Sequence, residues 1–434
     1  MNRTLSAIAL IATAAGSVTA APHQHTKVTN EQVVEVITPD GRTIEVQQRT
    51  LWRAPCTPGH NHGVIEPILR PANTVPTAIV SPRNRGAGFT LVFNVFGNVS
   101  PEALDALQQT TDYYAGIFQD NVTVELNMTF DPGAFGGTGT SFFDLPYEEY
   151  RNALIADADG DDVIPSILPT GSFPALRTPS GSVSNETMVT LTGANMQAIG
   201  MTVPPGAVAD IFVNDELDFD PSNGIGVPGT FGDFSGVDIL VHEAGHALGF
   251  VNVIEFGFDF ATALDLQRFP EDTADNPGGF DNPGSAAQFA ASPRALFVGV
   301  NVDHAYDDTQ SEFPLSTADG FQASHWLETG AAGFDGRVGV MEPAIAPGEN
   351  GFPDFFSQAD INAFDAIGWD IGPVAPDCPA DLAEPFGTLN FFDITAFIGL
   401  FNAGDSSADV AEPFGSLNFF DVAEYISLYN AGCP

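Results

Sequence analysis

Two histidines and one glutamate stand at a spacing that suits metal-assisted hydrolysis. They occur in residues 241–250, which read Val-His-Glu-Ala-Gly-His-Ala-Leu-Gly-Phe. On a helix, residues four apart share a face, so the imidazoles of His242 and His246 can bind one zinc ion. Glu243 lies beside the first of them and can take the proton of a zinc-bound water as that water attacks a carbonyl. These residues are therefore candidate metal ligands and a candidate general base.

The segment around this run is apolar on both sides. Apolar residues 239–241 precede the core of the run, residues 242–246, and apolar residues 247–248 follow it, which predicts a buried helix over residues 237–248. The alternative is a surface helix with two solvated histidines. We favour the buried helix, because burying two imidazoles and a carboxylate without a shared ligand would be costly. Gly249 then permits a left-handed backbone conformation by which the chain can leave the helix.

A catalytic zinc site needs a third protein ligand beside one open position. Asn252 stands six residues after His246, where a short-spaced third histidine would stand. His304 and His325 are the downstream candidates. His304 lies in an acidic, loop-like stretch, and we keep it as the reserve candidate.

Three motifs together resemble the leishmanolysin-like branch of the metzincin zinc peptidases. They are the histidine-glutamate run, residues 322–326 (Gln-Ala-Ser-His-Trp) and residues 338–343 (Val-Gly-Val-Met-Glu-Pro). The resemblance implies that His325, 79 residues after His246, is the third ligand, and that Met341 belongs to a turn beneath the metal. It also implies an α+β fold of the metzincin type, with a twisted sheet and an active-site helix. Asn252 excludes the short-spaced relatives.

Hydrophobic periodicity predicts the elements that must position these residues. Strands are expected over residues 89–96, 122–130 and 209–214, and helices over residues 101–119 and 147–156. The resemblance to the metzincins implies a closing helix over residues 358–369. A signal peptide is predicted over residues 1–20, and a pro-segment or N-terminal extension over residues 21–85. The peptidase domain is expected over residues 86–372.

The C-terminal residues 373–434 contain a duplication, in which the segment that starts at residue 380 recurs 28 residues later. Each copy ends in a helical pattern, so the repeat predicts two loop–helix units that pack on each other. The pair resembles dockerin modules, which implies calcium and a surface or scaffold partner. The candidate calcium ligands are Asp381, Asn390, Asp393, Asp409, Asn418 and Asp421. Residues 383–386 depart from the dockerin pattern, and a small stabilising appendage is the alternative.

Several further residues are secondary candidates. Cys56 could act as an inhibitory cysteine switch on the metal, and Cys378 could form a disulfide with Cys433. Asp157, Asp159 and Asp161 alternate as in a calcium loop, although an ordinary acidic turn is the alternative.

The composition restricts the partners of this chain. Thirteen Lys and Arg against 56 Asp and Glu give a formal net charge of −43, which disfavours nucleic acid and anionic membranes. With the signal peptide, this predicts a secreted or cell-surface location. The sequence as a whole predicts a secreted zinc endopeptidase (a hydrolase) acting on protein or peptide substrates. The alternatives are an attachment protein with an inactive peptidase domain, and a zinc hydrolase of non-peptide amides.

Overall fold

The computed structural model describes most of the chain in separate segments. These are residues 27–52, 74–83, 88–131, 135–158, 164–178, 183–206, 208–220, 234–252, 261–270, 285–297, 302–304, 313–316, 323–327, 338–345, 355–371, 391–403 and 417–431, with residues 232, 254, 380, 389, 408, 410 and 411. The statements below concern these residues.

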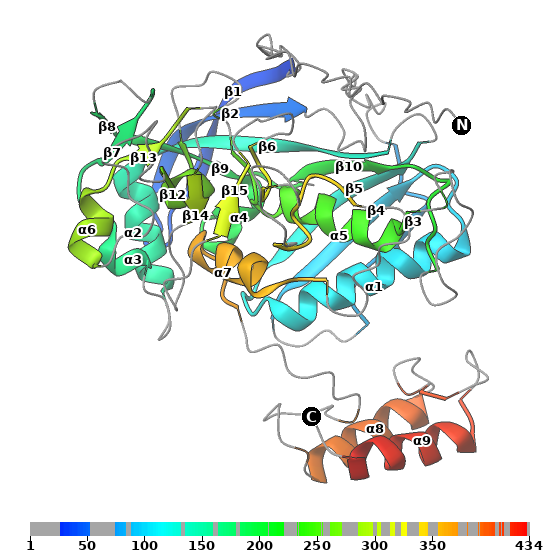
Figure 1. Ribbon diagram of the computed structural model, residues 1–434. Coiled ribbons are helices and arrows are strands. Elements are labelled where there is room, and N and C mark those ends of the chain that lie inside the picture. Colours follow the sequence, from blue (N-terminus) through cyan, green and yellow to red (C-terminus); the bar gives the residue numbers. More distant parts are fainter. Residues whose placement is uncertain are drawn as a thin grey trace, which may run out of the picture.

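A mixed, twisted sheet forms the framework of an α+β fold (Figure 1). Within the described residues it has nine strands. The main path is β1 (Lys27–Ile37), β2 (Thr43–Trp52), β6 (Gly136–Pro146), β10 (Ala209–Val213), β5 (Thr123–Phe130), β4 (Thr90–Phe96) and β3 (Ala78–Val80). β9 (Met188–Thr192) pairs with β6 and with β11 (Ala261–Thr262) off this path. β4, β5 and β10 run parallel, whereas β6 runs antiparallel to β10.

Two helices pack together against the sheet. α1 (Pro101–Ile117) contacts β4, and α5 (Gly236–Ala247) contacts β6 and β10; Figure 1 shows both alongside the strands. α1 begins as predicted, with the Ser100 side chain accepting a hydrogen bond from the amide of Ala103 and Pro101 in the first turn. Predicted and observed bounds of these elements agree to within two residues.

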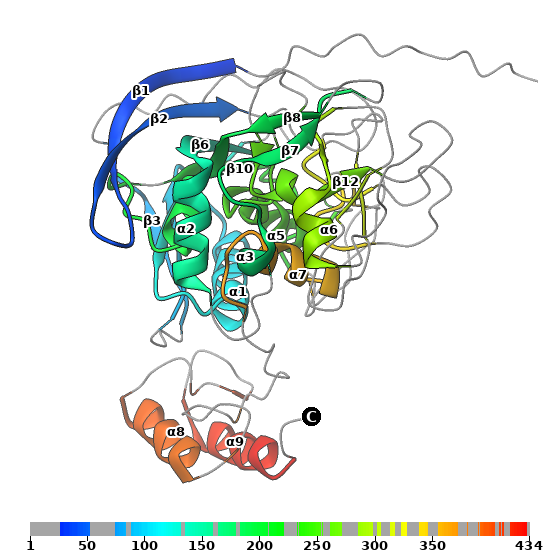
Figure 2. The same cartoon turned by 90° about the vertical axis from the view of Figure 1, so that its left-hand side faces the viewer.

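Further helices and two smaller sheets complete the fold (Figure 2). The helices are α2 (Tyr147–Asp157), α3 (Ile164–Ile167), α4 (Gly193–Ala198), α6 (Ala286–Ala291), α7 (Gln358–Ala366) and the 3-10 helix η4 (Leu264–Gln267). One small sheet contains β12 (Arg268–Pro270), β14 (Val302–His304) and β15 (Phe313–Leu315), and the other contains β13 (Arg294–Ala295), β7 (Phe173–Leu176) and β8 (Val183–Glu186).

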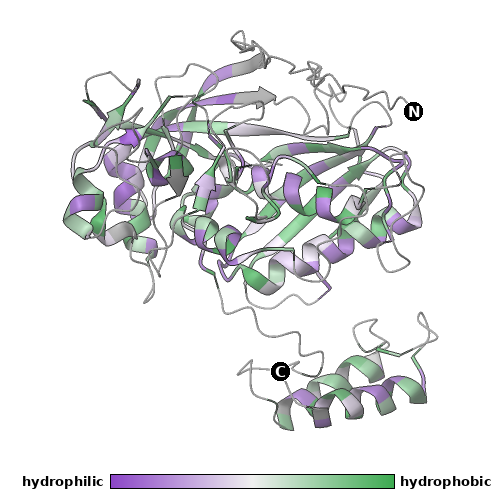
Figure 3. Cartoon of the chain, viewed as in Figure 1, coloured by the Kyte–Doolittle hydropathy of each residue, from purple (hydrophilic) through white to green (hydrophobic). Residues whose placement is uncertain are grey.

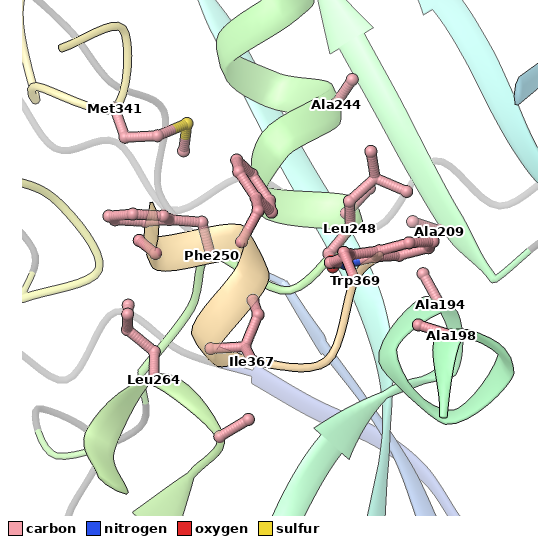
Figure 4. Packing of buried hydrophobic residues seen from close by; sticks show 14 of the residues in the cluster. Ala194, Ala198, Ala209, Ala244, Leu248, Phe250, Leu264, Met341, Ile367 and Trp369 are labelled. Carbon is pink, nitrogen blue, oxygen red and sulfur yellow. The ribbon is translucent and has the colours of Figure 1, made fainter. Parts of the chain in front are cut away.

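One hydrophobic core lies between these layers. Figure 3 shows hydrophobic residues along the central strands and alternation of hydrophobic and hydrophilic residues along α1, as expected of a helix with one buried face. Figure 4 shows the part of the core around the end of α5, where Leu248, Phe250 and Trp369 pack. The indole of Trp369 donates a hydrogen bond of 2.8 Å to the carbonyl of Leu248.

The N-terminal hairpin β1–β2 belongs to the main sheet. β2 pairs antiparallel with β6, from Gln47 opposite Asp144 to Trp52 opposite Gly139. Arg49 of β2 forms a buried ion pair with Asp144 of β6. β2 and β3 precede the boundary predicted at residues 85 and 86, and they pair with β6 and β4, which follow it. Whether the N-terminal part is removed stays a prediction.

The C-terminal repeats form a pair of helices with a small core of their own. α8 (Phe391–Ala403) and α9 (Phe419–Ala431) are the helical parts of the two copies. The rings of Phe397 and Tyr425 stack between them, with centroids 3.9 Å apart. A dockerin role for this pair stays a prediction. In the described part of the chain, no helix combines the length and apolar character that crossing a membrane requires.

Candidate metal centre

Helix α5 carries the first two histidines and is buried along its whole length. Its N-terminus is capped by Ser235, whose side chain accepts a hydrogen bond from the amide of Asp238. Just past its C-terminus, Gly249 has a φ of +119°, which residues with a Cβ rarely adopt. A Cβ there would also lie 2.1 Å from the side-chain oxygen of Asn195. The predicted exit from the helix at Gly249 is therefore present.

The three predicted imidazoles converge at one point. His242 and His246 come from α5, and His325 comes from a segment 79 residues further along the chain. The Nε2 atom of His246 lies 3.1 Å from the Nε2 atoms of both other rings. All three side chains are buried, and the exposed fraction of His325 is 1%. His304 lies in β14, where its backbone pairs with Arg268 and Phe313.

Backbone carbonyls fix the protonation of two of these rings. Nδ1 of His242 lies 2.7 Å from the carbonyl oxygen of Val340, and Nδ1 of His246 lies 2.7 Å from that of Phe250. A carbonyl can only accept, so each Nδ1 carries the hydrogen and the Nε2 atom of the neutral ring presents a lone pair. Two lone pairs 3.1 Å apart repel each other unless a cation lies between them.

The spacing of the nitrogens fits one small tetrahedral ion. Two nitrogens that each lie about 2.05 Å from a tetrahedral zinc ion are about 3.3 Å apart. The observed separations of 3.1 Å are close to this value. The residues present therefore fit a metal ion, and the structure contains a buried cluster able to bind one.

Glu243 is held by the neighbouring strand. The hydroxyl of Thr138 on β6 donates a hydrogen bond of 2.6 Å to Oε2 of Glu243, which is buried like the histidines. The same hydroxyl also lies 2.9 Å from the backbone carbonyl of Glu243. The position of the carboxylate is thus set by β6, and the sequence analysis did not single out Thr138.

Met341 packs directly beneath the helix. A Cβ added at Gly245, between the two histidines of α5, would lie 2.6 Å from the sulfur of Met341, so glycine allows the close approach. The carbonyl of Met341 accepts a hydrogen bond of 3.0 Å from the amide of Trp326, which follows His325. The turn that contains Met341 therefore touches both segments that supply the imidazoles.

The carboxylate of Asp360 accepts hydrogen bonds from this turn, a role that was not predicted from the sequence. Its Oδ1 accepts hydrogen bonds from the indole of Trp326 (2.7 Å) and the amide of Met341 (3.3 Å). Its Oδ2 accepts from the amides of Val340 and Ser357, each at 2.9 Å, and from the Ser357 hydroxyl. Burial raises the pKa of Asp360, while the hydrogen bond from Trp326 opposes that shift. Its position at N3 of α7, in a capping box with Ser357, was the available signal.

The C-terminal candidates that the structure describes have local roles. Asn418 caps α9, its side-chain oxygen accepting from the amide of Phe420 at 2.8 Å. Asp421 accepts from the amides of Asn418 (2.6 Å) and Ala411 (3.1 Å), and the hydrogen bond from Asn418 lowers its pKa. Asp393 is buried. Calcium binding at these residues stays a prediction.

Other secondary candidates lie outside the described residues. These are Cys56, Asp159, Asp161, Cys378, Asp381, Asn390, Asp409 and Cys433. Comparison of the chain with family models, curated proteins and solved structures found no match.

Proposed function

We propose that this chain is a zinc-dependent endopeptidase of the metzincin type, in its leishmanolysin-like branch. The main observation in support is the convergence of His242, His246 and His325, whose Nε2 atoms are spaced for one tetrahedral ion. A bound zinc ion would supply a Lewis acid and lower the pKa of a water molecule toward about 7. The buried carboxylate beside two of these ligands supports a hydrolytic role.

Glu243 would move the proton in this reaction. Its carboxylate takes a proton from the attacking water as the oxygen–carbon bond forms at the peptide carbonyl. It then gives that proton to the amide nitrogen as the carbon–nitrogen bond breaks, which balances the hydrolysis. The hydrogen bond from Thr138 to Oε2 keeps the carboxylate oriented between these two transfers.

The remaining residues would keep the ligands in place. The carbonyls of Val340 and Phe250 orient the rings of His242 and His246. Such outer partners typically change metal affinity 10- to 100-fold when lost. Met341 packs the turn closely against the helix at Gly245.

A combined metal and activity measurement on the full chain tests this proposal. We expect one zinc per chain by mass spectrometry, and casein digestion that a chelator abolishes and zinc restores. Glu243→Gln should keep the zinc and lose at least about 100-fold of the activity, whereas His325→Ala should lose the zinc. The exposed Glu102→Gln is a matched control.

One result would favour another function, and a second would refute the mechanism. Zinc binding with hydrolysis of small amides and no cleavage of peptides would indicate the amidase alternative. Equal casein digestion by Glu243→Gln and the unchanged chain would refute the proposed proton transfer.

A further inference from the structure

Three carboxylates from distant parts of the chain meet away from the histidines. Asp120 lies between α1 and β5, Asp157 is the last residue of α2, and Asp370 follows α7. One carboxylate oxygen of each lies within 4.8 Å of an oxygen of the other two. Because like charges at this distance repel, a bound cation or a shared proton would stabilise the arrangement.

Asp120 is the most deeply buried of the three. Its exposed fraction is 4%, and its Oδ2 accepts a hydrogen bond of 3.1 Å from the amide of Asp370. Among the described residues, no donor reaches its Oδ1, and no Lys or Arg forms an ion pair with it. A buried carboxylate oxygen without a donor is costly, and a cation would satisfy it.

We propose that Asp120, Asp157 and Asp370 bind a calcium ion that joins three segments of the sheet-containing part of the chain. Calcium prefers carboxylate oxygens at 2.3–2.6 Å, so two ligands on opposite sides of one ion are up to about 4.6–5.2 Å apart. The three oxygens, all within 4.8 Å of one another, can therefore reach one calcium ion. Magnesium demands stricter octahedral geometry and retains more water ligands.

The ion would stabilise the support of helix α5. The amide of Gln119 donates a hydrogen bond of 2.8 Å to the carbonyl of Asp370, so the two segments already run side by side. Trp369 stacks on Phe118 with centroids 4.8 Å apart and donates to the carbonyl of Leu248 at the end of α5. Calcium is thus expected to raise the thermal stability of this part of the chain. This inference does not rest on the proposed peptidase activity.

Tryptophan fluorescence offers a selective measurement. The three tryptophans are Trp52, Trp326 and Trp369, so the C-terminal pair of helices contributes no signal. The test uses the full chain, depleted of calcium on a chelating resin and then given calcium chloride or magnesium chloride alone. At calcium about 100-fold above Kd, the unfolding midpoint should rise by about 5–11 °C, with a smaller rise in magnesium.

Variants identify the residues responsible. Asp120→Asn should lose the calcium response, because an amide offers the ion no charged oxygen. If it does not fold, Asp157→Asn at a half-buried position should lose the response instead. The double variant Asp393→Asn/Asp421→Asn, in the C-terminal helices, should keep it.

Two outcomes would overturn the site. In the first, calcium leaves the midpoint of the unchanged chain where it was, which would indicate carboxyl groups that share a proton. In the second, calcium raises the midpoints of the unchanged chain and of the Asp120 variant equally.

Discussion

Replacement of Asp360 by asparagine should weaken the candidate metal centre without touching a ligand. An amide keeps one acceptor oxygen and places an NH2 group where the second oxygen stood. If its oxygen stays with the three donors on Oδ2, the indole of Trp326 and the amide of Met341 lose their acceptor. Each buried donor left without a partner costs about 1–3 kcal/mol, so the loss is about 2–6 kcal/mol. The opposite orientation would leave more donors unsatisfied.

Thermal unfolding and zinc affinity together measure this effect. In a unit of this size, each kcal/mol of stability lost lowers the thermal unfolding midpoint by about 2–4 °C. We therefore expect the midpoint of Asp360→Asn to fall by at least about 4 °C. Zinc affinity should fall about 10- to 100-fold, because Trp326, next to His325, and Met341, next to the Val340 carbonyl that orients His242, lose their acceptor. Glu102→Gln, which removes one exposed charge in α1, should shift the midpoint by at most about 2–4 °C. A midpoint and zinc affinity for Asp360→Asn equal to those of this control would refute the reasoning.

Three further perturbations test other contacts. Thr138→Val removes the hydrogen bond to Glu243 and should reduce kcat while zinc content stays unchanged; a lower zinc content would mean that Thr138 supports the ligands instead. Gly245→Ala introduces a Cβ 2.6 Å from the sulfur of Met341 and should lower the free energy of unfolding by about 1–3 kcal/mol. Urea titrations should show that adding Met341→Ala restores part of this free energy. Burial and the neighbouring Asp370 raise the pKa of Asp120 from 3.8 to about 8, so the calcium-free folded chain holds a proton that the unfolded chain releases. Its stability in urea should fall as the pH rises from about 4 to about 8, and a slope that persists in Asp120→Asn would contradict this cause.

The sequence predicted much of the scaffold because its signals are local. The period of apolar residues specified α1 and α5, and Gly249 specified the exit from α5. The 28-residue repeat specified α8 and α9. Each of these signals depends on neighbours within a few residues or on a direct repetition of letters.

What the sequence could not predict depends on contacts between distant segments. β1 and β2 were assigned to a leader because nothing in their sequence indicates pairing with β6, which comes almost a hundred residues later. Thr138 and Asp360 carry no motif, and their roles follow only from the approach of β6 and α7 to the site. The convergence of Asp120, Asp157 and Asp370 is equally invisible in one dimension.

The hairpin on β6 limits how an extended polypeptide can approach the glutamate. β2 already takes the pairing positions of β6 from Gly139 to Asp144, and it does so with a buried ion pair at Arg49. An extended peptide that pairs with those positions of β6 must first displace β2. Long extended peptides would therefore compete with the β1–β2 hairpin for β6. Short peptides that bind near Thr138 would not.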